Sequence, residues 1–340
     1  MSEKAKVRVG INGFGRIGRC AFKQFLSRDN CSVVGINDLA DGADLAYLLK
    51  YDSVHGWYAP KISSDERSIT VDGRAIPFFA QKNPAELPWG DLGADIVIES
   101  SGALRSRAKA AGHLAGGAKR VLVSAPSDDV DGTFVPGVNH ESYDPGKHTV
   151  VSMASCTTNC LAPVAKVLQE AFGIEHLMLT TVHAYTSSQA LMDTPVRKRR
   201  RGRAAALSII PTTTGATKAT EKVIPELAGR MDGIAFRVPV PDGSICDIVA
   251  VLQKDATVES VNGALERAAA EPRFQGILRI SDEQLVSQDV VGDTHSSIVD
   301  RDSTMLLRDR MVKVLSWYDN EWGYAARLVD FAVYLGERGV

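Results

Sequence analysis

The residues that could perform chemistry gather in one short segment, 155–160, which reads Ser-Cys-Thr-Thr-Asn-Cys. A run with helical spacing follows at 161–168, and we expect Pro163 to lie in its first turn, where proline is tolerated. Cys156 would then face the unpaired N–H groups at the positive end of a helix. That environment favours the thiolate, which is the nucleophilic form of cysteine. The alternative is that Cys156 is a small buried apolar side chain, as most free cysteines are.

A histidine that could act on this thiol ends the strand predicted at 177–182. A helix leaving Cys156 and a strand returning could bring the His183 imidazole beside the thiol. The imidazole would lower the pKa of the thiol and supply a base. The alternative is a structural role, which is commoner for a lone histidine. The other six histidines lie in segments predicted as loops or surface: His55, His113, His140, His148, His176 and His295.

Basic and hydroxyl side chains follow this histidine. Residues 197–203 contain six basic side chains, a pattern typical of a solvated surface or a nucleic-acid patch. Aromatic residues for base stacking are absent from this run. It is followed by the hydroxyl-rich segment 211–215, and Arg237 on a further strand is a good bidentate phosphate ligand. These features favour a small phosphorylated ligand over a polynucleotide.

The elements that must position these groups begin with a strand at 7–12, which breaks into Gly-Phe-Gly-Arg-Ile-Gly. In that motif Gly13 allows a tight turn, Gly15 lets the backbone approach a pyrophosphate, and Gly18 lets the next helix pack on the strand. The helix N-terminus then holds the phosphates.

An acidic residue completes this dinucleotide pattern. The second strand, at 32–36, is followed by Asp38, which stands where a carboxylate should hold the adenosine ribose hydroxyls. A carboxylate there repels the 2′-phosphate of NADP, so NAD is favoured. The alternative is a glycine-rich turn and a helix-capping aspartate, but strand, glycines, helix, strand and acid all agree with a dinucleotide site.

Strands and helices continue to alternate through the first half, with strands at 94–99, 120–123 and 149–152 and a helix at 107–114. This alternation predicts a parallel, doubly wound sheet. Ser124 follows one of these strands at the edge where ligands bind, although a turn-capping serine is an equal alternative. The second half differs: strands at 245–252 and 311–317, a helix at 258–270 and a terminal helix at 325–335 indicate an α+β domain with an antiparallel or mixed sheet.

Composition limits the class of protein. The chain has 340 residues, 44% hydrophobic and 24% charged, and a net charge of −2, values ordinary for a globular protein of one or two domains. Nothing in this balance attracts nucleic acid or an acidic membrane. The five cysteines are scattered without CxxC spacing, which argues against a disulfide framework and a zinc site and for a reducing compartment. With no leader or transmembrane run in the pattern, we expect a soluble cytoplasmic protein.

Taken together, these motifs resemble the phosphorylating glyceraldehyde-3-phosphate dehydrogenase family nearly from end to end. The resemblance rests on segments 11–19, 50–56, 154–160 and 316–321. It implies an NAD-binding Rossmann-type domain at 1–154, with the C-terminal helix 321–340 packing back on it. A catalytic α+β domain at 155–320 follows. It also implies a homotetramer whose subunit interface includes the basic stretch.

The resemblance assigns roles residue by residue. Cys156 would attack the aldehyde carbon of D-glyceraldehyde 3-phosphate, and His183 would take the thiol proton. The resulting thioester would be cleaved by inorganic phosphate to 1,3-bisphosphoglycerate. Thr186 and Arg237 match the site for the substrate's phosphate, and the attacking phosphate is matched by Ser155, Thr157, Arg201, Thr214 and Gly215. The cofactor contacts are matched by Gly13, Phe14, Gly15, Arg16, Ile17, Gly18, Asp38, Lys82, Ser124, Asn320 and Tyr324, and no metal is implied.

Some segments depart from the family pattern. Residues 100–104 replace a more usual Thr-Gly-aromatic sequence, which could loosen the cofactor pocket, and Thr194 stands where NAD-specific relatives often carry Leu. NADP is therefore a less favoured alternative cofactor. The loop at 199–203 is more basic than usual, and residues 239–244 also differ.

Two other functions compete with this one. Erythrose-4-phosphate dehydrogenase is a close relative that releases the acid by hydrolysis, but the hydroxyl groups at 183–186 and 211–215 favour the phosphorylating enzyme. An RNA-binding or thiol redox-sensing protein on a dehydrogenase fold would use the basic run and the candidate thiolate. Neither the net charge nor the aromatic residues support that class.

Overall fold

The computed structural model describes residues 6–339, so the segment 1–5, part of the expectation that no leader is present, lies outside the described residues. The chain divides into two compact units. Unit 1 comprises residues 6–134, Glu141–Ala154 and 325–339, and unit 2 comprises Val135–His140 and Ser155–Tyr324. The ranges 135–140 and 321–324, which the sequence placed with the first domain, are thus assigned to unit 2.

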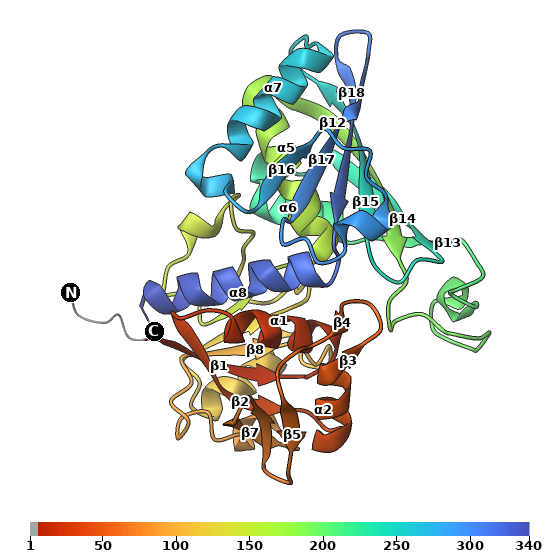
Figure 1. The fold of residues 1–340 in the computed structure, drawn as a ribbon. Coiled ribbons are helices and arrows are strands. Elements are labelled where there is room, and N and C mark those ends of the chain that lie inside the picture. Colours follow the sequence, from red (N-terminus) through yellow and green to blue (C-terminus); the bar gives the residue numbers. More distant parts are fainter. Residues whose placement is uncertain (1–5, 340) are drawn as a thin grey trace. The chain divides into compact units, whose positions relative to one another are not determined.

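The strands and helices of unit 1 alternate along the chain (Figure 1). They are β1 Val7–Asn12, α1 Arg16–Leu26, β2 Cys31–Asn37, α2 Gly42–Lys50, β3 Tyr51–Asp52, β4 Gly56–Trp57, β5 Ile62–Ser64, β6 Ser68–Val71, β7 Arg74–Phe79, β8 Ile96–Glu99, α3 Arg107–Ala110, α4 Gly112–Ala115, β9 Arg120–Val123, β10 Gly132–Thr133 and β11 Val150–Ser152.

In the described part of unit 1, nine strands form one sheet in the order β10-β11-β9-β8-β1-β2-β7-β6-β5. The pairs from β10 to β7 are parallel, and β6 and β5 add an antiparallel edge. β1 lies in the middle, between β2 and β8, so the glycine turn that follows it opens between their carboxyl ends. The predicted Rossmann-type parallel sheet is confirmed.

The terminal helix α8 (Trp322–Glu337) belongs to unit 1 from Ala325 onward. Its Phe331 ring lies 5.6 Å from the ring of Phe134, and its Asp330 forms an ion pair with Arg28 after α1. Gly336 lies so close to β1 that an added Cβ would meet Val7 side-chain atoms at 2.5 Å. Burial of aromatic rings such as these holds the chain end on this unit.

Unit 2 contains the longer elements. They are α5 Cys156–Phe172, β12 Ile174–Ala184, β13 Ile210–Thr213, α6 Ala216–Val223, β14 Met231–Val238, β15 Ser244–Leu252, α7 Val258–Ala269, β16 Leu278–Ser281, β17 Ser297–Leu307 and β18 Met311–Tyr318. Short 3₁₀ turns also occur in the chain, at Pro84–Glu86, His140–Ser142, Arg199–Gly202, Pro225–Leu227, Pro272–Phe274 and Ser287–Val290.

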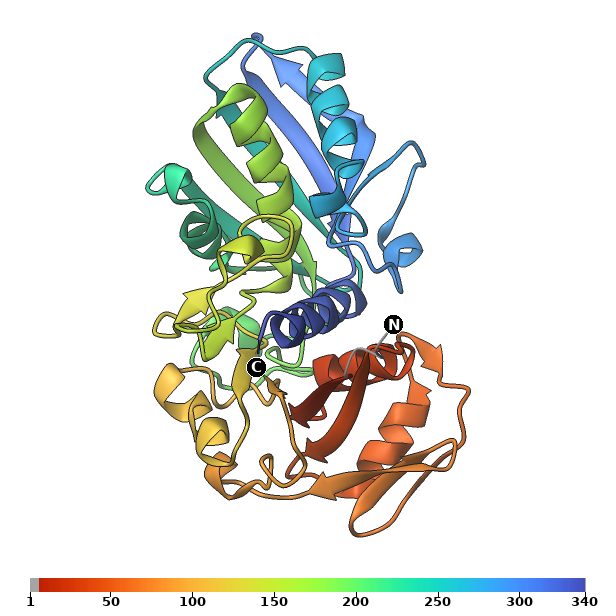
Figure 2. The same cartoon turned by 90° about the vertical axis from the view of Figure 1, so that its left-hand side faces the viewer.

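Seven strands of the described part of unit 2 form a sheet in the order β13-β14-β12-β15-β18-β17-β16. The pairs β12–β14 and β16–β17 are parallel, and the others are antiparallel. The helices α6 and α7 both contact α5, so the three cover one face of the sheet. Figure 2 shows α5 and α7 side by side on that face. The predicted α+β domain with a mixed sheet is confirmed.

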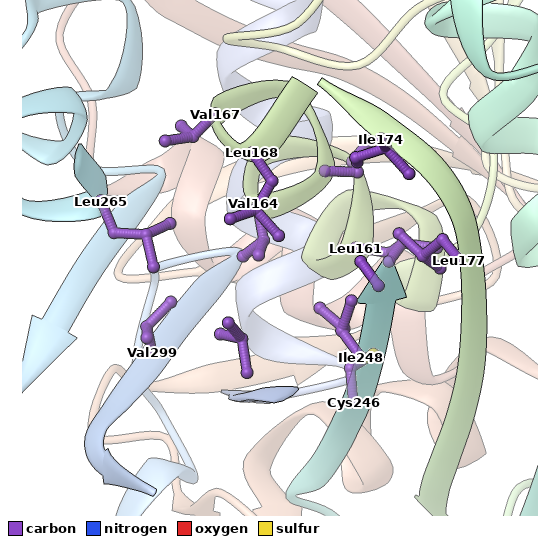
Figure 3. Close-up of a cluster of buried hydrophobic side chains, with 14 of the residues drawn as sticks. Leu161, Val164, Val167, Leu168, Ile174, Leu177, Cys246, Ile248, Leu265 and Val299 are labelled. Carbon is purple, nitrogen blue, oxygen red and sulfur yellow. The ribbon is translucent and has the colours of Figure 1, made fainter. Parts of the chain in front are cut away.

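The core of unit 2 lies between α5 and this sheet. Leu161, Val164 and Leu168 of α5 are fully buried in one cluster with side chains of the sheet, and Leu161 lies beside Leu177 of β12 and Ile248 of β15 (Figure 3). Burying a side chain of this size stabilises the fold by roughly 1.5–3 kcal/mol. The start of α5, and with it Cys156, is therefore anchored by the apolar packing of the turns that follow.

Three local expectations differ from the structure. Pro163 lies in the interior of α5 rather than in its first turn. Because proline has no backbone N–H, α5 loses one hydrogen bond at this position. The Pro163 side chain is buried in the core. The helix predicted at 107–114 is broken at Ala111 into α3 and α4, and the Gly112 that follows packs on Pro84 so closely that a Cβ would meet it at 2.6 Å. The terminal helix begins at Trp322, three residues early.

No helix of the described residues is long and apolar enough to cross a membrane.

Candidate active site

The thiol predicted as nucleophile lies at the first residue of α5. Ser155 caps this helix, with its Oγ accepting a hydrogen bond from the Thr158 N–H at 3.1 Å. Ala154, just before the cap, has φ of 56°, a left-handed conformation that is costly for a residue with a Cβ. Cys156 is half-buried, so its sulfur remains reachable while the helix start is tightly held.

The His183 imidazole lies beside this thiol, because β12 returns along α5 as the sequence predicts. The Nε2 atom is 3.5 Å from Cys156 Sγ, and Nδ1 is 2.7 Å from the carbonyl oxygen of Ala184. A carbonyl can only accept, so Nδ1 carries the proton and donates it. Nε2 is then the unprotonated nitrogen, which is the atom that can take the proton of the thiol.

Burial keeps both members of this pair neutral in the free chain. It raises the pKa of Cys156 to about 11 and lowers that of His183 to about 3, and Arg237 adds to the lowering of the histidine. The positive charge of Arg237 works against burial at the thiol, but burial is the larger influence. The sequence-based expectation of a lowered thiol pKa is therefore wrong for the free chain, since helix position alone ignores burial.

A guanidinium lies next to this pair. Arg237 on β14 is directly paired in register with His183 on β12. Its Nη1 donates to the Ala184 carbonyl at 2.9 Å and to Thr186 Oγ1 at 3.4 Å. Its Nε is buried and has no hydrogen-bond partner in the described chain. The structure thus brings Thr186 and Arg237 together, as the sequence assignment requires.

A chain of hydroxyl groups connects this arginine to a second one. Thr186 Oγ1 lies 2.8 Å from Ser188 Oγ. Arg201 donates to Ser188 Oγ at 2.9 Å and to Thr212 Oγ1 at 3.1 Å. Neither arginine forms an ion pair with a carboxylate of residues 6–339, and the pKa of Arg237 is lowered by burial and by Arg201. Two guanidinium groups held together without an acid make a site for an anion.

The other residues assigned to phosphate are only partly brought to this cluster. Thr157 is buried, and its hydroxyl lies 2.9 Å from Tyr318 Oη. Thr214 accepts a hydrogen bond from the Ala216 N–H at 3.2 Å, and Gly215 caps α6. Within the described residues neither Thr214 nor Gly215 bonds to Arg201 or Arg237. Space around Gly215 is open, because no atom lies within 4 Å of an added Cβ.

Unit 1 contains the candidate cofactor site, a cavity of ≈ 400 Å³ at the carboxyl ends of β1, β2 and β8. Among the predicted residues, Gly13, Gly15, Asp38 and Lys82 line it. The Asp38 carboxylate accepts hydrogen bonds from the N–H groups of Phe14 at 2.6 Å and Ala40 at 3.0 Å. Each of its oxygens keeps a lone pair for a ribose hydroxyl.

The glycine turn fits a dinucleotide. Gly13 has φ of 93°, and a Cβ on it would meet Ser101 N at 2.3 Å, so only glycine is tolerated here. A Cβ on Gly18 would meet the Gly13 carbonyl oxygen at 2.1 Å. Gly15 faces open space and caps α1 without any side-chain hydrogen bond. The first N–H groups of α1 therefore point to a cradle that a pyrophosphate can fill.

The remaining predicted cofactor residues lie elsewhere. Phe14, Arg16, Ile17, Gly18 and Ser124 are not part of the cavity lining. The Arg16 guanidinium forms an ion pair with Asp52 at 2.7 Å. In unit 2, buried Asn320 accepts a hydrogen bond from Ser244 Oγ at 2.5 Å. Tyr324 in unit 2 is also buried, which raises the pKa of its hydroxyl.

Sequence reasoning missed several side chains that hold these groups. Ser188 links the two arginines, and the hydroxyl run at 186–188 was a readable signal for it. Tyr318 places its hydroxyl between Thr157 and Thr181, and its ring packs edge-on against His183 at 5.9 Å. Only the fold reveals that contact. The prediction that His113 lies at the surface is wrong: it is fully buried.

Comparisons with known proteins agree with this arrangement. The family model described as "Glyceraldehyde 3-phosphate dehydrogenase, NAD binding domain" matches residues 7–107. The model described as "Glyceraldehyde 3-phosphate dehydrogenase, C-terminal domain" matches residues 155–320. The first match covers the glycine turn and Asp38, and the second covers Cys156 and His183.

Curated relatives resemble the chain over nearly its whole length. A glyceraldehyde-3-phosphate dehydrogenase of Geobacillus stearothermophilus is 54% identical over 98% of this chain and 99% of its own. One from Streptomyces coelicolor is 52% identical over the same shares. Glyceraldehyde-3-phosphate dehydrogenase 2 of Bacillus subtilis is 48% identical over 98% of both chains.

Proposed function

This chain belongs to the glyceraldehyde-3-phosphate dehydrogenase family, and we propose that its Cys156–His183 pair and its two arginines carry out the reaction of that family. The protein is an NAD-dependent glyceraldehyde-3-phosphate dehydrogenase of glycolysis. The residue assignment is supported by one observation: His183 Nε2 lies 3.5 Å from Cys156 Sγ, beside the Arg237 guanidinium, which forms no ion pair with a carboxylate of the described residues.

Cys156 Sγ adds to the aldehyde carbon of glyceraldehyde 3-phosphate while His183 Nε2 accepts the thiol proton. A neutral pair suits this step, because the imidazole is free to take the proton as the carbon–sulfur bond forms. The new oxygen develops negative charge near the N–H groups at the start of α5, which stabilise it. His183 returns a proton to that oxygen, giving a thiohemiacetal, and takes it back as the thioester forms.

Bound NAD supplies the acceptor for the hydride that leaves the carbon. The glycine turn at 13–18 and the N-terminus of α1 would hold its pyrophosphate, and Asp38 its adenosine ribose. The nearby carboxylate disfavours the additional phosphate of NADP, as predicted from the sequence.

The phosphate groups need positive charge. Arg237 and Thr186 would bind the phosphate of the substrate, because they lie closest to the Cys156–His183 pair through the shared Ala184 carbonyl. Arg201 would bind the inorganic phosphate that attacks the thioester, helped by Ser155, Thr157, Thr214 and Gly215. Attack forms the acyl phosphate and restores the thiol, which recovers its proton from His183.

A rate measurement tests this assignment of substrate and mechanism. NADH formation is followed with glyceraldehyde 3-phosphate and with erythrose 4-phosphate, each with and without inorganic phosphate, and with NAD and NADP in parallel. We expect sustained turnover only with glyceraldehyde 3-phosphate, NAD and phosphate together. Phosphate-independent turnover that prefers erythrose 4-phosphate would refute the proposal.

The competing functions gain no support from the comparisons. The relatives described above are named glyceraldehyde-3-phosphate dehydrogenase. The basic run at 197–203 motivated an RNA-binding or redox-sensing role. Its Arg201 instead donates to the hydroxyl groups of Ser188 and Thr212. This use of the run favours the enzyme.

A homotetramer is our proposal for the assembly. Five apolar side chains in the segment around the basic run are exposed: Leu191, Met192, Val196, Leu207 and Ile209. An apolar patch of this kind typically marks an interaction surface. Light scattering at micromolar concentration should give four times the chain mass of 36.6 kDa, and Leu207→Glu should lower it. A monomer at all concentrations would contradict the proposal.

We also expect the enzyme to act in the cytoplasm. All five cysteines are free thiols, which suits a reducing compartment. Fractionation of cells that express the tagged chain would test this location.

A further inference from the structure

A buried polar network lies behind the cofactor cavity of unit 1, and the established chemistry does not use it. Glu99 at the end of β8 and His113 on α4 are 2% and 0% exposed. His113 Nε2 is 3.0 Å from the Glu99 carboxylate, and His113 Nδ1 is 3.0 Å from Trp89 Nε1. An indole nitrogen can only donate, so Nδ1 accepts and Nε2 carries the proton that is donated to Glu99.

A second arm reaches Glu99 from the cavity side. Asn12 Nδ2 donates to the same carboxylate. The side-chain oxygen Oδ1 of Asn12 accepts from Asn37 Nδ2 at 2.6 Å, and Asn37 Oδ1 accepts from the Gln81 backbone N–H at 2.8 Å. Each amide thus has one orientation that satisfies its neighbours. One line of hydrogen bonds from Trp89 through His113, and another from the Gln81 N–H through Asn37 and Asn12, both end on the Glu99 carboxylate, and Asn37 Nδ2 donates a second hydrogen bond to the Gln81 carbonyl at 3.0 Å.

Glu99 also holds the segment that packs on the glycine turn. Its other oxygen accepts from the Ser101 N–H at 2.9 Å and from Ser101 Oγ. The Ser101 backbone lies directly against Gly13, with no room for a Cβ between them. Asn12 is the residue before Gly13. The Glu99 carboxylate is therefore hydrogen-bonded to both residues that flank the glycine turn, Asn12 and Ser101.

We propose that Glu99, oriented by His113, is a positioning residue that sets the affinity of this enzyme for its dinucleotide. It does not line the cavity, whereas Asn12, Asn37, Gln81 and Ser101 do. Glu99 acts through these neighbours by fixing the glycine turn and the rim in the shape that receives the pyrophosphate. The inference rests on the cofactor site described above.

An isosteric variant tests the role of the carboxylate. In Glu99→Gln one of the two acceptor oxygens becomes an NH₂ group, so at least one of the donors around it loses its partner. An unpaired buried donor is unfavourable, so the variant should hold the glycine turn less firmly, and we expect the dissociation constant for NAD, measured by calorimetry without aldehyde, to rise on the order of 10-fold. KM for NAD should rise in parallel, and kcat should stay within about twofold.

The matched control is Asp131→Asn in the same unit. Asp131 also has four donors, from the Thr149 N–H and hydroxyl, the Val150 N–H and Arg107, but it does not line the cavity. A merely structural effect would lower the melting temperature of both variants and leave both NAD affinities alone. We expect the NAD affinity of Asp131→Asn to stay within about twofold of wild type.

Two variants at His113 keep the test decisive if Glu99→Gln folds poorly. In His113→Gln the side-chain amide can donate to Glu99 and accept from Trp89, so NAD affinity should be retained. In His113→Leu both hydrogen bonds are lost, and the affinity should fall. Equal affinity in Glu99→Gln and wild type, equal loss in Asp131→Asn, or equal affinity in the two His113 variants would overturn the proposal. A wild-type chain that fails to bind NAD would instead refute the cofactor assignment.

Discussion

The two units differ in how far their buried charged side chains are satisfied by partners within the chain. In unit 1, Glu99 has four donors around it, and each member of its network has a partner. In unit 2, Arg237 and Arg201 have hydroxyl and carbonyl partners but no carboxylate, and Arg237 Nε is buried without a partner in the described chain. The Glu99 network has its hydrogen-bond partners within unit 1, whereas no carboxylate of the described residues balances the charges of Arg201 and Arg237.

This difference follows from what each site must bind. A buried polar group without a partner costs free energy, and binding of an anionic ligand to the two arginines would offset that cost. A site that is already satisfied gives affinity by holding its shape before the ligand arrives. We therefore expect changes near the Glu99 network to act on the cofactor, and changes in the arginine cluster to act on the phosphorylated substrate.

Removal of the thiol should have the largest effect. Cys156→Ala eliminates the nucleophile, and we expect kcat to fall by at least about 10⁴-fold, as for other covalent catalysts that lose their nucleophile. Stopped-flow measurement of NADH formation checks this. The matched control is Cys160→Ala, one helical turn on, whose thiol contacts Ser316 in the core. Its kcat should remain near wild type, and comparable loss in both variants would remove the special role of Cys156.

The arginine cluster provides the next largest effect. Arg237→Met removes the cation beside His183, and loss of a buried charge partner typically costs 2–5 kcal/mol. We expect kcat/KM for glyceraldehyde 3-phosphate to fall on the order of 100- to 1,000-fold, while the dissociation constant for NAD is unchanged. Arg203→Met is the control, because Arg203 is exposed and paired with Asp193 at 2.8 Å. A fall in NAD affinity in Arg237→Met would contradict the separation of the two sites.

The depressed pKa of His183 predicts a pH dependence of stability. Burial lowers this pKa to about 3 in the folded chain, whereas an unperturbed histidine titrates near 6.5. Between these two values the unfolded chain binds a proton that the folded chain does not. Stability should therefore fall as pH drops below about 6.5, by up to about 1.4 kcal/mol per pH unit from this residue.

Urea unfolding of wild type and His183→Asn between pH 7 and pH 5 tests this dependence. The variant should lose less stability across this range than wild type, because it lacks the titrating group. Parallel curves for the two proteins would show that His183 does not resist protonation.

The smallest effect concerns the binding of inorganic phosphate to the chain. Inorganic phosphate at about ten times its dissociation constant should stabilise the folded chain by roughly 1.4 kcal/mol, which raises the melting temperature by a few degrees. Sodium chloride at equal ionic strength is the control. Arg201→Met should lose most of this increase, and an unchanged increase would place the phosphate elsewhere.

The sequence predicted the parts of the site that depend on local pattern. The strand at 7–12, the three glycines and Asp38 form one continuous signal, and in the structure Gly13, Gly15 and Asp38 line a single cavity while Gly18 packs on the carbonyl oxygen of Gly13. The predicted approach of His183 to Cys156 follows from a helix and a returning strand. These predictions succeed because the residues lie close along the chain or on adjacent elements.

What the sequence could not reveal depends on contacts between distant segments. The roles of Trp89, His113 and Glu99 appear only when α4 packs against β9 and places His113 beside Glu99 at the end of β8, and His113 was interpreted as a surface residue for that reason. The predicted direction of the Cys156 pKa shift was also wrong. The position of Cys156 at a helix start is visible in the sequence, but its burial is not. Pro163 lies in the helix interior, buried with the apolar residues of α5 that pack on the sheet, and those contacts are not visible in the sequence.

The central claim is that Cys156 carries the acyl group and that phosphate, held by the arginine cluster, removes it. The most direct test mixes the enzyme with glyceraldehyde 3-phosphate and NAD without phosphate, quenches with acid, and locates the adduct by peptide mass spectrometry. We expect one NADH per active site and a 3-phosphoglyceroyl adduct on the Cys156 peptide, which disappears when phosphate is added before the quench. NADH formation with no adduct on Cys156, or with an adduct that phosphate does not discharge, would contradict this account.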